Sequence, residues 1–172
     1  MAITISILAL LATFFQAYLQ RAHNQKSVKP FGQIDLRDMD GHLFVAVSNN
    51  GVGPLIIENV EYIKDVHSYT KLNDLLTIDI ALYDNVAIAD GVVKVLYPGT
   101  QLRLFEIVFN QAEPRDMIKL TCAELSLLTI QISAKDIYEN KITIIRNLEW
   151  FDRHVKGSNC FARVAVENVD LH

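Results

Sequence analysis

The sequence predicts a mainly β protein in which a single N-terminal transmembrane α-helix precedes a β-sandwich-like domain. Three observations lead to this prediction. The first 20 residues contain no charged side chain. From Pro30 onward, short runs alternate between apolar and polar side chains, and turn residues separate these runs. Since 51% of the residues are hydrophobic, the chain can fill a core. We therefore expect a helix with its basic flank at residues 1–29 and a β domain at residues 30–172.

The N-terminal segment is long enough to cross a bilayer. Twenty helical residues extend about 30 Å, which is the thickness of one hydrocarbon core. The basic residues Arg21, Lys26 and Lys29 all follow the uncharged run, and none precedes it. Because a cleaved signal peptide would begin with basic residues and end at small ones, we expect a retained anchor. The positive-inside rule then places residues 21–172 on the cytoplasmic side.

One face of the expected helix is small and polar. Residues three, four or seven positions apart share one stripe at 100° per residue, while Ile, Leu and Phe cover the opposite side. Such a stripe lets helices approach closely and hydrogen-bond to each other, or it lines a wet lumen. The candidate pore or helix-contact residues are Ser6, Thr13, Gln16, Gln20 and Asn24.

Two other interpretations of the stripe remain open at this point. The two glutamines lie near the end of the uncharged run, where the headgroups would solvate them and Tyr18 would act as an interfacial anchor. The hydroxyl groups of serine and threonine can also bond back to a carbonyl of their own helix.

The remaining sequence predicts many short strands with turns between them, which is typical of a sandwich or a barrel. The run Asn50–Gly53 leads into Pro54 and predicts a β-turn that needs positive φ rather than a phosphate-binding loop. A short helix is expected at 69–76. The expected extended segments are 31–37, 42–47, 55–64, 77–82, 92–96, 101–109, 117–120, 127–133, 142–145, 148–151 and 161–166.

Charge and motif content argue against most chemistry. Residues 30–172 contain 13 basic and 20 acidic side chains, so we expect no face that binds nucleic acid. The five histidines are scattered, and Cys122 and Cys160 do not form a Cys-x-x-Cys pair. In the cytoplasm both thiols are expected to be reduced. Hydrolase elbows and phosphate-binding glycine loops are absent from the sequence. We therefore expect no enzyme activity, no metal and no cofactor.

One short motif points the other way. Arg37 and His42 are spaced like the arginine and histidine of HEPN ribonucleases, a family in which the pair resembles a catalytic site held on helices. Here the two residues flank an Asp-Gly turn between runs that are expected to be extended, so the structural context differs. A ribonuclease that uses Arg37 and His42 is therefore one hypothesis for the function, and it ranks behind the two that are described below.

Three stretches carry a resemblance to known proteins: Ser48–Ile57, Tyr97–Phe105 and Ile132–Tyr138. They are similar to segments of small bacterial proteins with one N-terminal membrane helix and a cytoplasmic β-sandwich, in which Asn-x-Gly-x-Gly-Pro and Tyr-x-Asp-Ile-Tyr-Gly motifs recur. This chain has Ala134 in place of the first tyrosine and Glu139 in place of the last glycine. These motifs are structural rather than catalytic.

The size and layout of the whole chain also resemble the membrane accessory protein of type VI-B CRISPR systems. That resemblance implies a homo-oligomeric ring that forms a pore in the bacterial inner membrane. It further implies a functional link to an RNA-guided ribonuclease, whose antiphage defence the pore enhances through loss of membrane integrity. The alternative hypothesis is a membrane-tethered module that recruits a protein partner through its β domain.

Overall fold

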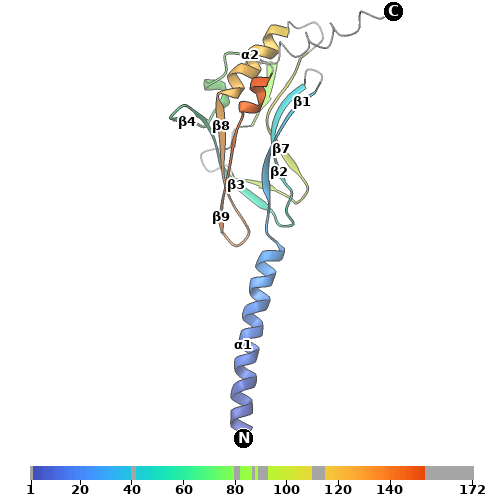
Figure 1. Ribbon diagram of the computed structural model, residues 1–172, viewed down its shortest axis with the longest axis vertical. Helices are drawn as coiled ribbons and strands as arrows, with labels where there is room; N and C mark the ends of the chain where they lie inside the picture. Colours follow the sequence, from blue (N-terminus) through green and yellow to red (C-terminus); the bar gives the residue numbers. More distant parts are fainter. Residues whose placement is uncertain are drawn as a thin grey trace, which may run out of the picture.

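The computed structural model has an elongated shape, with a long helix projecting from one end of a β domain (Figure 1). The structure describes residues 2–39, 42–79, 82–86, 88, 93–109 and 115–153. Helix α1 (Ala2–Ser27) contains no buried residue, and by length and composition it can cross a membrane. The predicted N-terminal helix and the mainly β domain are both confirmed.

The β domain consists of two antiparallel sheets. The first has the strand order β1-β2-β7-β5, and the second has the order β4-β3-β8-β9, with β6 also paired to β3. The strands of the first sheet are β1 (Gly32–Met39), β2 (His42–Asn49), β7 (Gln101–Val108) and β5 (Tyr83–Asn85). Those of the second are β4 (His67–Tyr69), β3 (Leu55–Lys64), β8 (Leu128–Lys135), β9 (Lys141–Asn147) and β6 (Lys94–Leu96).

The core lies between the two sheets. Every second residue of β8 is buried, from Leu128 to Ala134, as expected for a strand with one face on the core. Strand β2 differs because it is central in its sheet and is buried on both faces from Leu43 to Asn49. Its outward-facing Phe44 is covered by the guanidinium groups of Arg37 and Arg103, which lie 5.4 and 5.2 Å from the ring centre.

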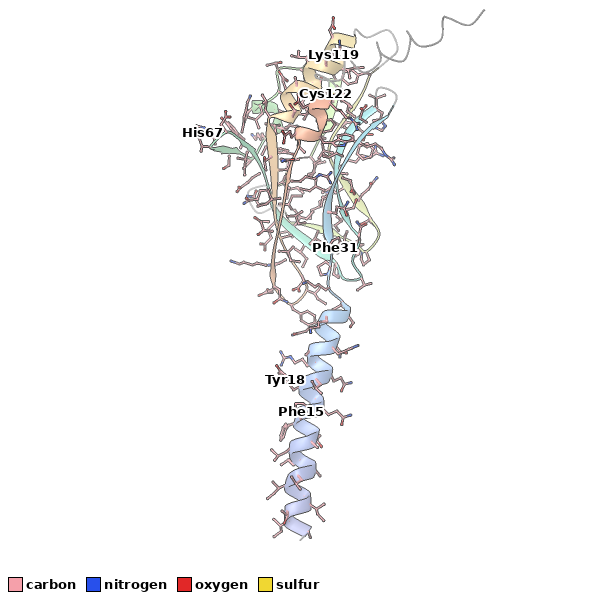
Figure 2. All side chains as sticks on the ribbon, in the orientation of Figure 1. Phe15, Tyr18, Phe31, His67, Lys119 and Cys122 are labelled. Carbon is pink, nitrogen blue, oxygen red and sulfur yellow. The ribbon has the colours of Figure 1, made fainter. Side chains whose placement is uncertain are left out.

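Helical segments close the end of the domain that lies far from α1 (Figure 1). They are η1 (Leu72–Asp74), α2 (Arg115–Ser126) and η3 (Glu149–Asp152). Helix α2 buries Thr121, Cys122 and Leu125, and Phe151 of η3 is buried beside them. Figure 2 shows Cys122 and Lys119 on α2 at this end of the molecule.

Four predicted segments need correction. Residues 117–120, expected to be extended, belong to α2, whose apolar positions repeat with helical spacing over the longer stretch Met117–Leu125. Residues 148–151 enter η3 instead of a strand. The described residues of 77–82 form no strand, and the backbone N–H of Thr77 donates to Glu124 at 3.0 Å. The helix expected at 69–76 shrinks to η1.

The other predicted strands that fall on described residues are confirmed within a few residues, and β3 has the predicted bounds. The predicted strand 161–166, like Cys160, lies outside the described residues.

A buried tyrosine gives a first test of the core. Tyr62 is 2% exposed, and its hydroxyl group makes no hydrogen bond within the described part of the chain. Burial, and then neighbouring Tyr83, raises the pKa of Tyr62. We expect Tyr62→Phe to stabilise the protein by about 1 kcal/mol, because it removes an unpaired polar group. Chemical denaturation measures this change.

The matched control for this prediction has the opposite sign. The hydroxyl of Tyr83 donates to Asn73 Oδ1 at 2.9 Å. Tyr83→Phe should therefore destabilise the protein by about 1 kcal/mol. Loss of stability in Tyr62→Phe would contradict this description of the core.

Candidate membrane-proximal site

The segment that joins α1 to β1 is held against the β domain. The backbone N–H of Asn50 donates to the carbonyl of Phe31 at 2.8 Å, and that of Val52 donates to Lys29 at 3.3 Å. Both donors belong to the β2–β3 loop. Figure 2 shows Phe31 where the helix meets the domain. The helix is thus joined to the domain by a hydrogen-bonded segment rather than by a loose linker.

Asn49 lies at the centre of this junction and is 0% exposed. Its Oδ1 accepts hydrogen bonds from the backbone N–H groups of Phe31 at 3.2 Å and Gly51 at 3.1 Å. Its Nδ2 donates to the carbonyls of Gly53 at 2.7 Å and Leu96 at 3.0 Å. Two acceptor and two donor positions of one side-chain amide are therefore used, and they tie the junction, the β2–β3 loop and β6 together.

The two glycines of the Asn-x-Gly-x-Gly-Pro motif allow close backbone approach. A Cβ on Gly51 would lie 2.3 Å from the nitrogen of Phe31, and one on Gly53 would lie 1.8 Å from the carbonyl oxygen of Val28. The prediction that these glycines are needed for positive φ was wrong. Among the described glycines, positive φ occurs at Gly99 and not at Gly51 or Gly53. The motif is structural, and its role is to seat the helix junction.

A second turn, between β8 and β9, reaches toward the same helix end (Figure 1). The carboxylate of Asp136 accepts from the N–H groups of Tyr138 at 2.8 Å and Asn140 at 2.9 Å, and from the Asn140 side chain at 2.8 Å. Burial alone would raise the pKa of Asp136, but these hydrogen bonds and the charge of Lys29 outweigh it and lower the pKa. Glu139 has φ +64°, a left-handed backbone conformation that glycine adopts at less cost than glutamate does.

A cleft of about 750 Å³ separates the end of α1 from this β8–β9 hairpin. Lys26 and Lys29 line one wall, and Lys141 and Ile144 line the other. Lys135, the cross-strand partner of Lys141, is paired with Glu58 at 2.9 Å. Within the described part of the chain, neither Lys26 nor Lys141 is in an ion pair. The cleft therefore has a positive rim over a partly apolar wall.

The polar stripe of α1 divides into two groups. The hydroxyl of Ser6 donates to the carbonyl of Ala2 at 3.0 Å, and that of Thr13 donates to Ala9 at 2.8 Å. Both hydroxyl protons are thus used inside the helix, as the alternative interpretation anticipated.

The amide side chains of the stripe behave differently. Gln16 and Gln20 line a shallow hollow with His23, and Gln20 and Asn24 line another with Tyr138 and Arg21. Among the described residues, none hydrogen-bonds to the side chain of Gln16, Gln20 or Asn24.

Arg37 and His42 lie on the outer face of the first sheet rather than on helices. His42 Nε2 is 2.6 Å from Glu106 Oε1, and Arg37 stacks on Phe44. Glu106 also pairs with Arg103; that hydrogen bond lowers the pKa of Glu106 more than the contact with His42 does. Buried Cys122 has a thiol pKa raised by burial to about 12, so its thiolate is scarce at neutral pH.

Sequence reasoning predicted Arg21, Lys26 and Lys29 as membrane-flanking residues. It placed Asn49, Asp136 and Tyr138 in structural motifs without assigning them to this site, and it missed Lys141. For the turn the local signal is Asp136 itself, since an aspartate often bonds the backbone N–H two residues on, here that of Tyr138.

No protein-family model matches the sequence, and no curated protein is significantly similar to it. Among solved structures, the chain is similar to the archaeal flagellum of Methanospirillum hungatei strain JF1. The sequences are 14% identical, the match covers 85% of this chain and 84% of that chain, and the TM-score is 0.31.

Proposed function

We propose that this protein is a non-enzymatic, single-pass membrane protein that associates through α1 into a homo-oligomeric ring and forms a pore. One observation carries the proposal: the amides of Gln16, Gln20 and Asn24 share one stripe of an apolar, exposed helix and have no hydrogen-bond partner in the described part of the chain. An amide without a partner is costly in hydrocarbon, and the uncharged run contains Gln16 and ends at Gln20. A second helix, or a wet lumen, removes that cost.

The junction supports the same proposal. Because Asn49 fixes the junction and the hairpin reaches the helix, a ring of helices also positions the β domains around a common axis. A closed ring shields strand edges that a single chain exposes. In this proposal the basic flank places the β domain in the cytoplasm.

The resemblance to the accessory protein of type VI-B CRISPR systems extends the proposal to a role. The pore would act in the bacterial inner membrane and would enhance antiphage defence by an RNA-guided ribonuclease. This role is a functional link and needs no direct contact with nucleic acid. Deletion of the protein in a host that carries the effector, followed by counting of surviving cells after phage challenge, tests it.

A second candidate, the membrane-tethered binding module, is favoured by a different observation. Val93, Val95 and Tyr97 on and beside β6 are exposed apolar side chains, which suit a protein contact. In this alternative the protein is monomeric or dimeric, and the β domain recruits the partner.

Replacing the stripe glutamines tests the pore. We expect the double variant Gln16→Leu, Gln20→Leu to reduce ion efflux from proteoliposomes at least about tenfold, because each change removes an interhelical hydrogen bond or a polar lumen group. Gln25→Leu is the matched control, since Gln25 lies off the stripe. Unchanged efflux in the double variant would contradict the assignment of Gln16 and Gln20 to the pore. An equal loss of efflux in Gln25→Leu would also contradict it, because the effect would then not be specific to the stripe.

A further inference from the structure

The β8–β9 hairpin ends at the level where α1 leaves its uncharged run. Tyr138 lines a hollow together with Ala17, Gln20 and Arg21 of the helix. Gln20 is the last residue of the uncharged run and Arg21 is the first charged one. With α1 across a bilayer, the tip of the hairpin therefore lies at the boundary between hydrocarbon and headgroups.

The side chains at this tip suit that position. Ile137 is 48% exposed and Tyr138 is 43% exposed, so the turn presents two large apolar or aromatic side chains to its surroundings. Apolar side chains at such a tip are costly in water, whereas tyrosine is enriched at membrane interfaces. The turn itself is held in shape by Asp136, which makes three hydrogen bonds within it. The tip is thus presented on a well-defined turn.

The cleft behind the tip has the chemistry of an anion site. Lys26 and Lys29 enter it from the helix side and Lys141 enters from β9, whereas Asp136 is the one acidic side chain among its described lining residues. That carboxylate is already occupied by Tyr138 and Asn140. The net charge of the cleft is therefore positive.

The walls of the cleft are also partly apolar. Phe31, Ile142 and Ile144 line it next to the lysines. A free phosphate compound gains nothing from such walls, while a phospholipid places its phosphate among the lysines and its glycerol and first acyl carbons against the apolar side chains.

From this arrangement we infer that the cleft between α1 and the β8–β9 hairpin binds the headgroup of an anionic phospholipid, with Ile137 and Tyr138 inserted into the membrane interface. The inference rests on the membrane placement of α1 in the proposed function and is independent of pore formation. Lys141 is the distinguishing residue. Basic residues that follow a membrane helix attract anionic lipid in any case, but Lys141 comes from the β domain and completes a site of defined shape.

Native mass spectrometry of the full-length protein in detergent, with added phosphatidylglycerol or phosphatidylcholine, tests the site. We expect one phosphatidylglycerol per chain to be retained in preference to phosphatidylcholine. Lys141→Gln should weaken this retention about fivefold, which is the effect of one basic residue near an anionic surface. Lys119→Gln is the matched control, since Lys119 is exposed on α2 at the far end of the molecule (Figure 2).

Three outcomes would overturn the inference: equal retention of the two lipids, equal loss in Lys141→Gln and Lys119→Gln, or equally tight binding of free glycerol 3-phosphate. The last result would indicate a soluble phosphate ligand. The same spectra give the number of chains in each particle, so failure of the lipid site is distinguishable from failure of the oligomer.

A fluorescence measurement tests the position of the hairpin tip. In a Trp150→Phe background, the tryptophan introduced by Tyr138→Trp should be quenched by brominated phospholipid in proteoliposomes. The native Trp150, on η3 at the opposite end of the domain, should not be quenched. Equal, weak quenching at both positions would show that the tip does not enter the interface.

Discussion

Asn49→Ala is expected to lower the free energy of unfolding by about 4 kcal/mol. The substitution leaves the N–H groups of Phe31 and Gly51 and the carbonyls of Gly53 and Leu96 without the partner that Asn49 provides. A buried polar group that loses its partner costs about 1–3 kcal/mol, and partial solvation of the loosened junction offsets some of the total. Chemical denaturation of the full-length protein in detergent measures the change.

Two further variants sharpen this prediction. Asn50→Ala is the control, because the exposed Asn50 side chain makes one long contact, with Gln33 at 3.4 Å. It should change stability by no more than about 0.5 kcal/mol. Asn49→Asp keeps the acceptor for Phe31 and Gly51 but sets a carboxylate oxygen against two carbonyls, so it should also destabilise the protein. If Asn49→Ala is as stable as Asn50→Ala, the junction is not organised by Asn49.

Gly53→Ala should disturb the connection between α1 and the β domain. The added Cβ would lie 1.8 Å from the carbonyl oxygen of Val28 and 2.7 Å from its carbonyl carbon. Both atoms are backbone, so no side-chain rotation relieves the overlap and the junction must move. We expect a loss of about 3 kcal/mol, at the upper end of the range for overpacking. We also expect faster hydrogen exchange at the N–H groups of Asn50 and Val52, which donate to the junction.

The neighbouring residue provides the control for this variant. Val52 is 67% exposed, so truncating its side chain removes little packing from the junction. Val52→Ala should leave both the stability and the exchange of these N–H groups close to the wild-type values. Wild-type exchange at Asn50 in Gly53→Ala would mean that the helix end is not packed on the β2–β3 loop.

The fold was predictable where a local sequence pattern was long enough to distinguish a helix from a strand. The uncharged run predicts α1 from composition alone, and the alternation in 55–64 predicts β3 with the bounds that the structure has. Helix α2 was missed because the segment 117–120 is too short to distinguish a period of two from one of 3.6. The buried positions that reveal the helix, such as Cys122 and Leu125, lie beyond that segment.

The candidate site was only partly predictable, since it depends on long-range contacts. The sequence identified Lys26 and Lys29 by their position after the apolar run, but nothing local links them to Lys141 on β9. The motif around Asn49 was recognised as structural, whereas its glycines were assigned to turn conformation instead of close approach to Val28. The amides of Gln16 and Gln20 were identified from helical periodicity, and their association with other chains remains a prediction.

The central claim is that α1 brings several copies of this chain together in the membrane. The number of chains in the full-length protein, purified in mild detergent, tests it most directly by native mass spectrometry combined with particle averaging. We predict one discrete ring of more than two copies, and we predict that Gln16→Leu, Gln20→Leu disperses it while Gln25→Leu does not. A monomer or a dimer in the wild-type protein would contradict the claim and would favour the membrane-tethered binding module.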